Sequence, residues 1–262
     1  MTLKSDLELA NRLADAAGEA IRPFFRAAFQ HEKKADSSPV TEADRAAETA
    51  IREILERERP EDGIIGEEFG TAREGASRQW VLDPIDGTIS FMAGRPIFGT
   101  LIALMQDGWP LLGMIDQPIT RERWVGAIGQ SSTLNNDPAK TRRCADLAKA
   151  SLATSGPHYF SEEEAQQFLM LASKVNRQLI VYGGDCYNYA LLASGHIDVI
   201  VEAGLKLHDY AALAPIVEGA GGQMCDWEGN PLSAESDGKV IALGDSARLD
   251  DVLEALHGRH GR

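Results

Sequence analysis

The stretch WVLDPIDGT, over residues 80–88, constrains this chain more than any other part of its sequence. A short apolar run leads into Asp83, a pattern that predicts a buried strand giving way to a loop. Pro84 has no backbone N–H and is therefore expected to end the pairing of that strand. Asp83 and Asp86 are then expected at the end of a strand, which is where open sheets bind ligands.

The two aspartates predict a binding site for a cation. Carboxylates this close together repel each other unless a positive charge lies between them. Hard divalent cations such as Mg2+ prefer oxygen ligands and keep room for water and phosphate. Gly87 and Thr88 follow, and a helix or nest that begins there would direct backbone N–H groups toward an anion such as phosphate. The same residues also fit a tight turn with an Asx cap, and both interpretations are open at this point.

The composition is ordinary for a globular protein, with an excess of acidic residues. The chain has 262 residues, of which 44% are apolar and 25% are charged, and its net charge is −14. This charge argues against binding to nucleic acid, which requires basic patches. No apolar run approaches the roughly twenty residues of a membrane span, and the N-terminus lacks the apolar segment of a signal peptide. The three cysteines match no zinc pattern, and they predict that the protein works in a reducing cytoplasm.

The periodicity of apolar residues predicts a chain of two parts. For the first part it predicts a helix over 3–29 interrupted at Pro23, a polar loop over 30–39, a helix over 42–58, and strands over 63–66, 80–83, 98–105, 111–117 and 123–128. For the second part it predicts strands over 151–154, 178–182, 197–202, 223–225 and 239–243, and helices over 161–175, from Asp185 onward, over 207–219 and over 247–257. The first set is typical of an antiparallel meander and the second of a helix-covered α/β layer. A composition shift over 131–141 predicts a division into residues 1–134 and 135–262.

Three motifs resemble those of the inositol monophosphatase superfamily. They are GEE over residues 66–68, WVLDPIDGT over 80–88 and HDYAALAPIVEGAGG over 208–222, in the order and at the separations typical of that superfamily. The resemblance implies an α+β fold, a layered α/β/α/β/α sandwich of the inositol monophosphatase and fructose-1,6-bisphosphatase type. It also implies a homodimeric, Mg2+-dependent phosphomonoesterase that acts on a small substrate.

The resemblance implies two Mg2+ ions, with a third and weaker one near Glu67, and it assigns their ligands. Glu67, Asp83 and the carbonyl of Ile85 would bind one ion. Asp83, Asp86 and Asp209 would bind the second. Without the resemblance, Glu67 also fits an exposed acidic loop, and Asp209 also fits a helix cap.

The resemblance also assigns the residues of the reaction. Thr88 and Glu67 would align the attacking water, and the turn of Asp86, Gly87 and Thr88 would hold the phosphate oxygens. Asp44 would accept a hydrogen bond from the Thr88 hydroxyl, although its place also fits a carboxylate that stabilises the first turn of a helix. Water would attack phosphorus directly, without a covalent phosphoenzyme.

The segment GGDCYNY, over 183–189, lies where the superfamily contacts the non-phosphate part of its substrate. Together with FMAGRPIFGTLIAL, over 91–104, it resembles the histidinol-phosphatase branch. Asp185, Glu202 and Asp209 would face the substrate, and such carboxylates suit an ammonium or imidazolium group. The alternative interpretation of Asp185 is a helix N-cap.

These expectations favour a histidinol-phosphate phosphatase of histidine biosynthesis. The alternatives are an inositol-1-monophosphatase or broad sugar phosphatase on the same scaffold, and a non-catalytic binding protein that kept the fold. The loop lysine of the superfamily maps to Lys33 or Lys34, and the sequence does not decide between them. The sequence also does not show where the side chains of Lys206 and His208 point. His208 occupies a position at which the superfamily usually has Trp.

Overall fold

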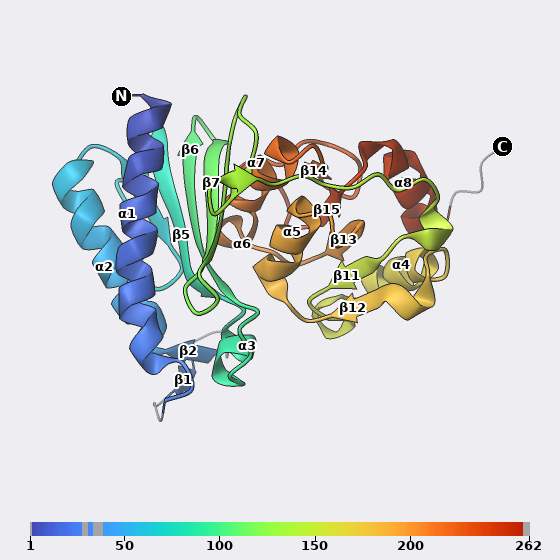
Figure 1. Cartoon of the computed structure of the whole chain (residues 1–262), viewed down its shortest axis with the longest axis horizontal. Helices are drawn as coiled ribbons and strands as arrows, with labels where there is room; N and C mark the ends of the chain where they lie inside the picture. The colour runs from blue at the N-terminus through green and yellow to red at the C-terminus, as the bar shows by residue number, and fades with distance from the viewer. Residues whose placement is uncertain (1, 28–30, 34–38, 259–262) are drawn as a thin grey trace.

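The chain folds into alternating layers of helices and sheets. The computed structural model describes residues 2–27, 31–33 and 39–258. Within them the order is helices, sheet, helices, sheet, helices (Figure 1). Apolar cores lie between successive layers. This arrangement confirms the predicted α/β/α/β/α sandwich. No helix in these residues has both the length and the apolar character needed to cross a membrane.

The first outer layer consists of two helices, α1 (Leu3–Ile21) and α2 (Glu42–Glu58), whose apolar faces pack on the larger sheet. α2 spans the residues predicted for it. α1 ends earlier than the predicted residue 29, where the chain passes into a short 3-10 helix, η1 (Arg22–Phe24). The reason is Pro23, which cannot donate the backbone hydrogen bond that an α-helix would need there.

The predicted polar loop over residues 30–39 contains two short strands. β1 (His31–Lys33) pairs antiparallel with β2 (Pro39–Thr41). The prediction of a loop is therefore wrong for residues 31–33 and for Pro39, because polar side chains do not prevent backbone groups from pairing with each other. Lys34 lies outside the described residues, and the side chain of Lys33 is likewise not described.

The larger sheet has eight strands within the described residues, in the order β10-β9-β8-β7-β6-β5-β3-β4. They are β3 (Gly63–Gly66), β4 (Gly70–Ala72), β5 (Arg78–Asp86), β6 (Gly99–Gln106), β7 (Trp109–Gln117), β8 (Glu122–Ala127), β9 (Thr133–Leu134) and β10 (Asp137–Pro138). The strands from β6 to β8 form the predicted antiparallel meander, and β5, β9 and β10 extend it. β3 pairs with β5 in parallel. Asp107 and Gly108 both have positive φ, as a two-residue type I′ turn between β6 and β7 requires.

The smaller sheet has five strands in the described part of the chain, in the order β12-β11-β13-β15-β14. They are β11 (Leu152–Thr154), β12 (Ile180–Tyr182), β13 (Val199–Glu202), β14 (Gln223–Cys225) and β15 (Val240–Leu243). Its outer face is covered by α4 (Glu162–Ala172) and α8 (Leu249–His257). The larger sheet continues to Pro138, so the proposed division after residue 134 falls inside the β9–β10 hairpin.

The layer between the sheets contains α5 (Asp185–Ala193), α6 (Leu207–Tyr210) and α7 (Leu213–Gly219). The single helix predicted over 207–219 is thus divided in two. Gly113 of β7 lets this layer approach closely, because a side chain there would overlap the backbone of Ala212. Gly126 of β8 does the same beside Pro215. The close packing places α6 against β5, the strand that carries the aspartates.

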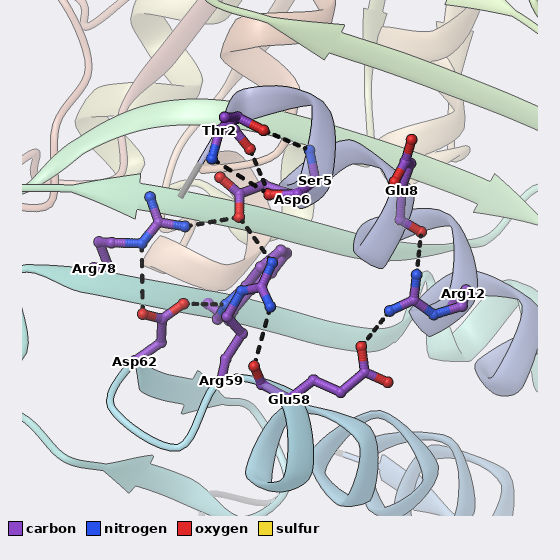
Figure 2. A network of polar contacts seen from close by, with 10 residues as sticks. Thr2, Ser5, Asp6, Glu8, Arg12, Glu58, Arg59, Asp62 and Arg78 are labelled. Carbon is purple, nitrogen blue, oxygen red and sulfur yellow. Dashed lines mark hydrogen bonds and ion pairs between the residues drawn. The ribbon is translucent and has the colours of Figure 1, made fainter.

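A buried cluster of charged residues ties the start of α1 to the end of α2 and to β5 (Figure 2). Asp6 is 1% exposed and lies 3.0 Å from Arg78 Nη2 and 3.4 Å from Arg59 Nη2. Asp62 lies 3.4 Å from Arg78 Nε and accepts a hydrogen bond from Trp80 Nε1 at 3.0 Å. Because each buried carboxylate has an arginine partner, the cluster fixes α1 against the sheet.

Replacing Asp6 with Asn is expected to lower the free energy of unfolding by roughly 3 kcal/mol, because the guanidinium groups of Arg59 and Arg78, which are partly buried, lose a counter-charge. Chemical denaturation measures the change. Lys4→Gln on the same helix is the control, since the Lys4–Glu8 pair is exposed and 4.0 Å apart, and such pairs contribute little. Equal effects of the two substitutions would show that the buried cluster does not fasten α1.

Candidate active site

The end of β5 brings the two adjacent aspartates into one site. The expectation that Pro84 ends the pairing is wrong: pairing with β6 is interrupted after Asp83 and resumes at Asp86, opposite Gly99. Residues three apart in a regular strand point to opposite faces. The irregularity absorbs the missing N–H of Pro84 and lets both carboxylates reach the same cluster.

Asp83, Asp86 and Asp209 form a compact acidic cluster. One carboxylate oxygen from each lies within 4.8 Å of the other two. Burial raises the pKa of Asp83 well above its usual value, and the charges of Glu67 and Asp86 raise it further. Burial and the charges of Asp185 and Asp209 likewise raise the pKa of Asp86 well above its usual value. Ionised together, these carboxylates would repel one another strongly.

A divalent cation fits this cluster. Asp83 Oδ1 is buried and has no hydrogen-bond partner among the residues that the structure describes. A hard cation between the carboxylates would relieve their repulsion and would coordinate such an oxygen. The three ligand candidates offer only oxygen atoms, which suits Mg2+ rather than an ion that prefers thiolate.

Asp209 reaches the cluster from the second half of the chain, on α6. Its Oδ2 accepts a hydrogen bond from the backbone N–H of Lys206 at 2.6 Å, and its Oδ1 lies 3.5 Å from His208 Nε2. Burial raises the pKa of Asp209, and nearby His208 opposes this change. His208 therefore stands beside an acid of the cluster, a position that the sequence did not reveal.

Glu67 borders the cluster at the turn after β3. Its backbone N–H donates to the Leu82 carbonyl at 3.1 Å, next to Asp83 in the chain. Its carboxyl group also forms a hydrogen bond with Asp83, which contributes to the raised pKa of Asp83. The structure thus brings Glu67 to the acids with which it was predicted to act, and its role as a ligand stays a prediction.

Glu48 of α2 holds this turn, a role that the sequence analysis missed. Its buried carboxylate accepts hydrogen bonds from the backbone N–H groups of Glu68 at 2.8 Å and Phe69 at 3.2 Å. Gly66 is needed beside it, because a side chain there would overlap the Glu48 carboxylate. The available signal was a glutamate within the buried stripe of α2, one turn before Ile51.

The structure gives Thr88 a different partner from the predicted Asp44. Thr88 Oγ1 donates a hydrogen bond to the carbonyl of Ile85 at 3.1 Å, and a hydroxyl has only one proton to donate. The Ile85 carbonyl keeps a second lone pair, so it can still bind a metal ion as predicted. Asp44 is buried in the first turn of α2, and its role at the site stays a prediction.

The predicted phosphate-binding turn opens a helix, as expected. Gly87 has a φ of 88° and directly precedes α3 (Thr88–Met92). The first N–H groups of a helix have no partner within the helix and favour an anion. A side chain at Gly87 would press on the Asp185 carboxylate, so this turn and the GGD segment lie against each other.

A cavity of about 190 Å³ adjoins the acidic cluster. It is lined by two acids of that cluster, Asp86 and Asp209, and by both acids predicted to face the substrate, Asp185 and Glu202. Residues that the sequence assigned to metal and to substrate therefore meet in one place. Its aromatic lining, Tyr159 and Tyr189, was not predicted.

Asp185 is held at this cavity by an unusual backbone conformation. Gly183, Gly184 and Asp185 have φ values of 79°, 115° and 43°, a left-handed region that glycine adopts freely and aspartate tolerates. Gly184, rather than Asp185, is the N-cap of α5, so the alternative interpretation of Asp185 as a cap is not supported. Cys186 donates its backbone N–H to Asp86 Oδ2 at 2.6 Å, which fixes the start of α5 against the cluster.

Glu202 ends β13 and lines the same cavity. Ser155 donates its backbone N–H and its hydroxyl to Glu202 Oε1, at 2.8 and 2.9 Å. Burial nevertheless raises the pKa of Glu202 to about 8, and burial also raises the pKa of Asp185. The cavity thus concentrates carboxyl groups that ionise readily only when a positive charge joins them.

Comparisons with known proteins agree with this geometry. The family model described as the inositol monophosphatase family matches residues 2–259. The chain is 47% identical to the bifunctional phosphatase IMPL2, chloroplastic, of Arabidopsis thaliana, over 96% of this chain and 77% of that protein. It is 37% identical to the histidinol-phosphatase of Mycobacterium tuberculosis, over 96% of this chain and 98% of the relative. A solved structure described as an inositol monophosphatase from Zymomonas mobilis has a TM-score of 0.90 and 52% identity, over 98% of this chain and 99% of that one.

The layered fold, its acidic cluster and these relatives define the class of protein, which is a phosphatase. The chain belongs to the inositol monophosphatase family, whose enzymes are typically Mg2+-dependent. The acidic cluster is in keeping with that dependence.

Proposed function

We propose that this chain is a Mg2+-dependent phosphatase that hydrolyses L-histidinol phosphate to L-histidinol and phosphate. The observation that carries the proposal is the cavity in which Asp185 and Glu202 stand beside Asp86 and Asp209. A cavity rich in carboxyl groups favours a substrate that carries positive charge. Histidinol phosphate has an ammonium group and an imidazole ring next to its phosphate ester, whereas an inositol phosphate has only hydroxyl groups.

The residues of the acidic cluster would hold the metal. Asp83, Asp86 and Asp209 offer converging oxygen ligands, and Glu67 adjoins Asp83. When bound, Mg2+ supplies positive charge that polarises the phosphoryl group and makes water a better nucleophile. We propose that the site binds two Mg2+ ions and a third, weaker one near Glu67.

The other residues of the site would position the reactants. Backbone N–H groups at Gly87 and Thr88 would orient the phosphate at the start of α3. Glu67 and the Thr88 hydroxyl would align the water for a direct in-line attack on phosphorus. Asp44, which is buried in the first turn of α2, would act near the metal ions. Asp185 and Glu202 would bind the ammonium and imidazole groups of the leaving alcohol.

The relatives support this substrate and also favour a second one. The histidinol-phosphatase of Mycobacterium tuberculosis matches over nearly the full length of both chains. The solved structure with 52% identity is described as an inositol monophosphatase, so the alternative is an inositol-1-monophosphatase or a broad sugar phosphatase. Phosphate release from histidinol phosphate, inositol 1-phosphate and sugar phosphates, each with Mg2+, tests the proposal. A higher kcat/KM for inositol 1-phosphate than for histidinol phosphate would overturn it.

Asp185→Asn is expected to raise KM for histidinol phosphate by roughly 10- to 100-fold, because a charged hydrogen bond contributes about 1.5–3 kcal/mol. KM for inositol 1-phosphate should change much less. Asn tolerates the left-handed backbone of this position, so the substitution tests charge and not strain. Asp250→Asn, at an exposed site on α8, removes the same charge away from the cavity and is the control. An equal rise in KM for both substrates would refute an ammonium contact at Asp185.

We further propose that the protein acts in the cytoplasm, as its cysteines suggest, and that it is a homodimer, as the superfamily resemblance implies. Within each chain, residues 1–134 would supply Glu67, Asp83 and Asp86, and residues 135–262 would supply Asp209 and the substrate-binding acids. The converging carboxylates of Asp83, Asp86 and Asp209 support this division of labour.

A further inference from the structure

One side chain that lines the cavity carries a polar group for which the described residues supply no hydrogen-bond partner. Tyr189 lies on α5 and is 2% exposed, and its hydroxyl has no hydrogen-bond partner among the described residues. Buried hydroxyl groups are ordinarily hydrogen-bonded, because an unpaired one makes the folded state less stable. A phenylalanine would fill the same space without that penalty. The hydroxyl therefore calls for an explanation other than packing.

Tyr189 belongs to the part of the site that is predicted to bind the substrate. It lines the same cavity as Asp185 and Glu202. Apart from burial, the charge of Glu202 contributes most to raising the pKa of Tyr189, ahead of Asp86 and Asp209. Tyr189 is therefore surrounded by the acids of the cavity, two of which are predicted substrate contacts.

The hydroxyl also supplies a capability that the neighbouring acids lack. Once a positively charged substrate has ionised them, Asp185 and Glu202 can only accept hydrogen bonds, and the Ser155 hydroxyl already donates to Glu202. The Tyr189 hydroxyl can donate a hydrogen bond to a lone pair and can also accept a hydrogen bond. A ligand that has both an N–H group and a nitrogen lone pair, as a neutral imidazole ring does, would satisfy the acids and the tyrosine together.

We propose that the Tyr189 hydroxyl is a specificity contact that binds a nitrogen heterocycle on the leaving alcohol of the substrate. This inference rests on the proposed function, since it extends the same cavity from recognition of charge to recognition of the ring. It assigns the nitrogen lone pair of the ring to Tyr189 and leaves the ring N–H and the ammonium group to the carboxylates. For a phosphomonoester that carries the ammonium group without the ring, kcat/KM should not depend on the Tyr189 hydroxyl.

Tyr189→Phe is the test, with two phosphate esters that differ in the ring. Histidinol phosphate carries both groups, and 2-aminoethyl phosphate keeps the phosphate and the ammonium group but has no ring. The substitution is expected to lower kcat/KM for histidinol phosphate about tenfold, mainly through KM, because one hydrogen bond is lost. The value for 2-aminoethyl phosphate should stay within about twofold. Equal changes for the two esters, or no change for either, would overturn the contact.

Tyr187→Phe is the matched control on the same helix. The Tyr187 hydroxyl donates to Glu122 Oε2 at 2.7 Å, so its loss should lower the melting temperature and leave the ratio of the two esters unchanged. Tyr189→Phe should leave the melting temperature unchanged or raise it, since no hydrogen bond is broken. A lower melting temperature for Tyr189→Phe, with parallel losses on both esters, would show a structural role instead.

Binding of L-histidinol to the Mg2+-loaded protein separates this inference from the proposed function. If wild-type protein releases no phosphate from histidinol phosphate, the proposed function fails. The Tyr189 contact still stands in that case if Tyr189→Phe weakens histidinol binding about tenfold in a calorimetric titration. It fails if the variant binds histidinol as tightly as wild type, or if wild type does not bind histidinol.

Discussion

Asp83→Asn is expected to lower kcat/KM at least about a thousandfold, because both proposed metal ions depend on this carboxylate and the charge they supply is the main source of catalysis. The same substitution is expected to stabilise the metal-free protein. Asp83 is buried among like charges and one of its oxygens has no hydrogen-bond partner in the described structure. A neutral amide of the same shape removes that repulsion.

The stability gain should depend on pH with a definite sign. The pKa of Asp83 lies well above its ordinary value of 3.8. Between these two values the folded protein keeps a proton that the unfolded chain has released, so stability falls as pH rises. Wild type and Asp83→Asn should therefore have similar melting temperatures near pH 4 and diverge as the pH increases, with the variant more stable. Thermal unfolding in the presence of a chelator measures this.

Asp198→Asn is a control with the opposite sign. Asp198 is buried, and it accepts hydrogen bonds from Arg142 Nε and Nη2, both at 2.6 Å, and from Ser151. The pKa of Asp198 is lowered by these partners, so its charge contributes stability above the ordinary pKa. Its replacement should reduce stability at neutral pH and leave turnover intact. If Asp83→Asn instead reduced stability and retained turnover, Asp83 would be an ordinary structural carboxylate.

Saturating Mg2+ is expected to raise the melting temperature of the wild-type protein by about 5–10 °C at pH 8. A ligand at a hundred times its dissociation constant stabilises the folded state by about 2.7 kcal/mol, and for a chain of this size each kcal/mol shifts the melting temperature by roughly 2–4 °C. At pH 5 the shift should be far smaller, because burial and repulsion keep protons on Asp83 and Asp86, and the ion must displace them.

KCl at the same ionic strength is the control for that measurement, since screening alone would act without a specific site. Asp83→Asn should abolish most of the Mg2+-dependent shift at pH 8. A shift of equal size at pH 5 and pH 8, or one that KCl reproduces, would mean that the cation does not bind to the raised-pKa acids of the cluster.

Much of the architecture could be predicted from the sequence because it depends on local patterns. The apolar stripe of α2 predicts that helix over its full length. The capping box of Ser161 and Glu164 predicts the start of α4, and the structure contains it. The turn at Asp107 and Gly108 likewise follows from residue types that favour positive φ. Each of these features is decided by neighbours in the chain.

Features that depend on distant partners could not be predicted. Pairing through Pro84 depends on β6, which resumes the ladder at Asp86. In the sequence Glu48 is only one polar residue of a helix. Its role depends on the turn after β3, which packs beside it in the fold. Tyr189 lies on the buried face of α5, where an aromatic residue ordinarily indicates core packing. Its distinction is a hydroxyl that has no hydrogen-bond partner in the described part of the chain, which only the assembled structure reveals.

The convergence of the metal-site acids could be predicted only in part from the sequence. Spacing alone left Asp83 and Asp86 open to interpretation as a turn, and nothing in the intervening chain places Asp209 near them. The resemblance to a known superfamily predicted the meeting, and the structure shows that packing of α6 against β5 achieves it. The physical cause is the close approach that Gly113 and Gly126 permit between the sheet and the inner helices.

The most direct test of the account is anomalous diffraction from crystals grown with Mn2+, which accepts the same oxygen ligands as Mg2+. We expect anomalous peaks bounded by Asp83, Asp86 and Asp209, with Glu67 at the edge, and their loss in Asp83→Asn. Crystals that show these carboxylates directed away from one another, with no manganese between them, would contradict the central claim.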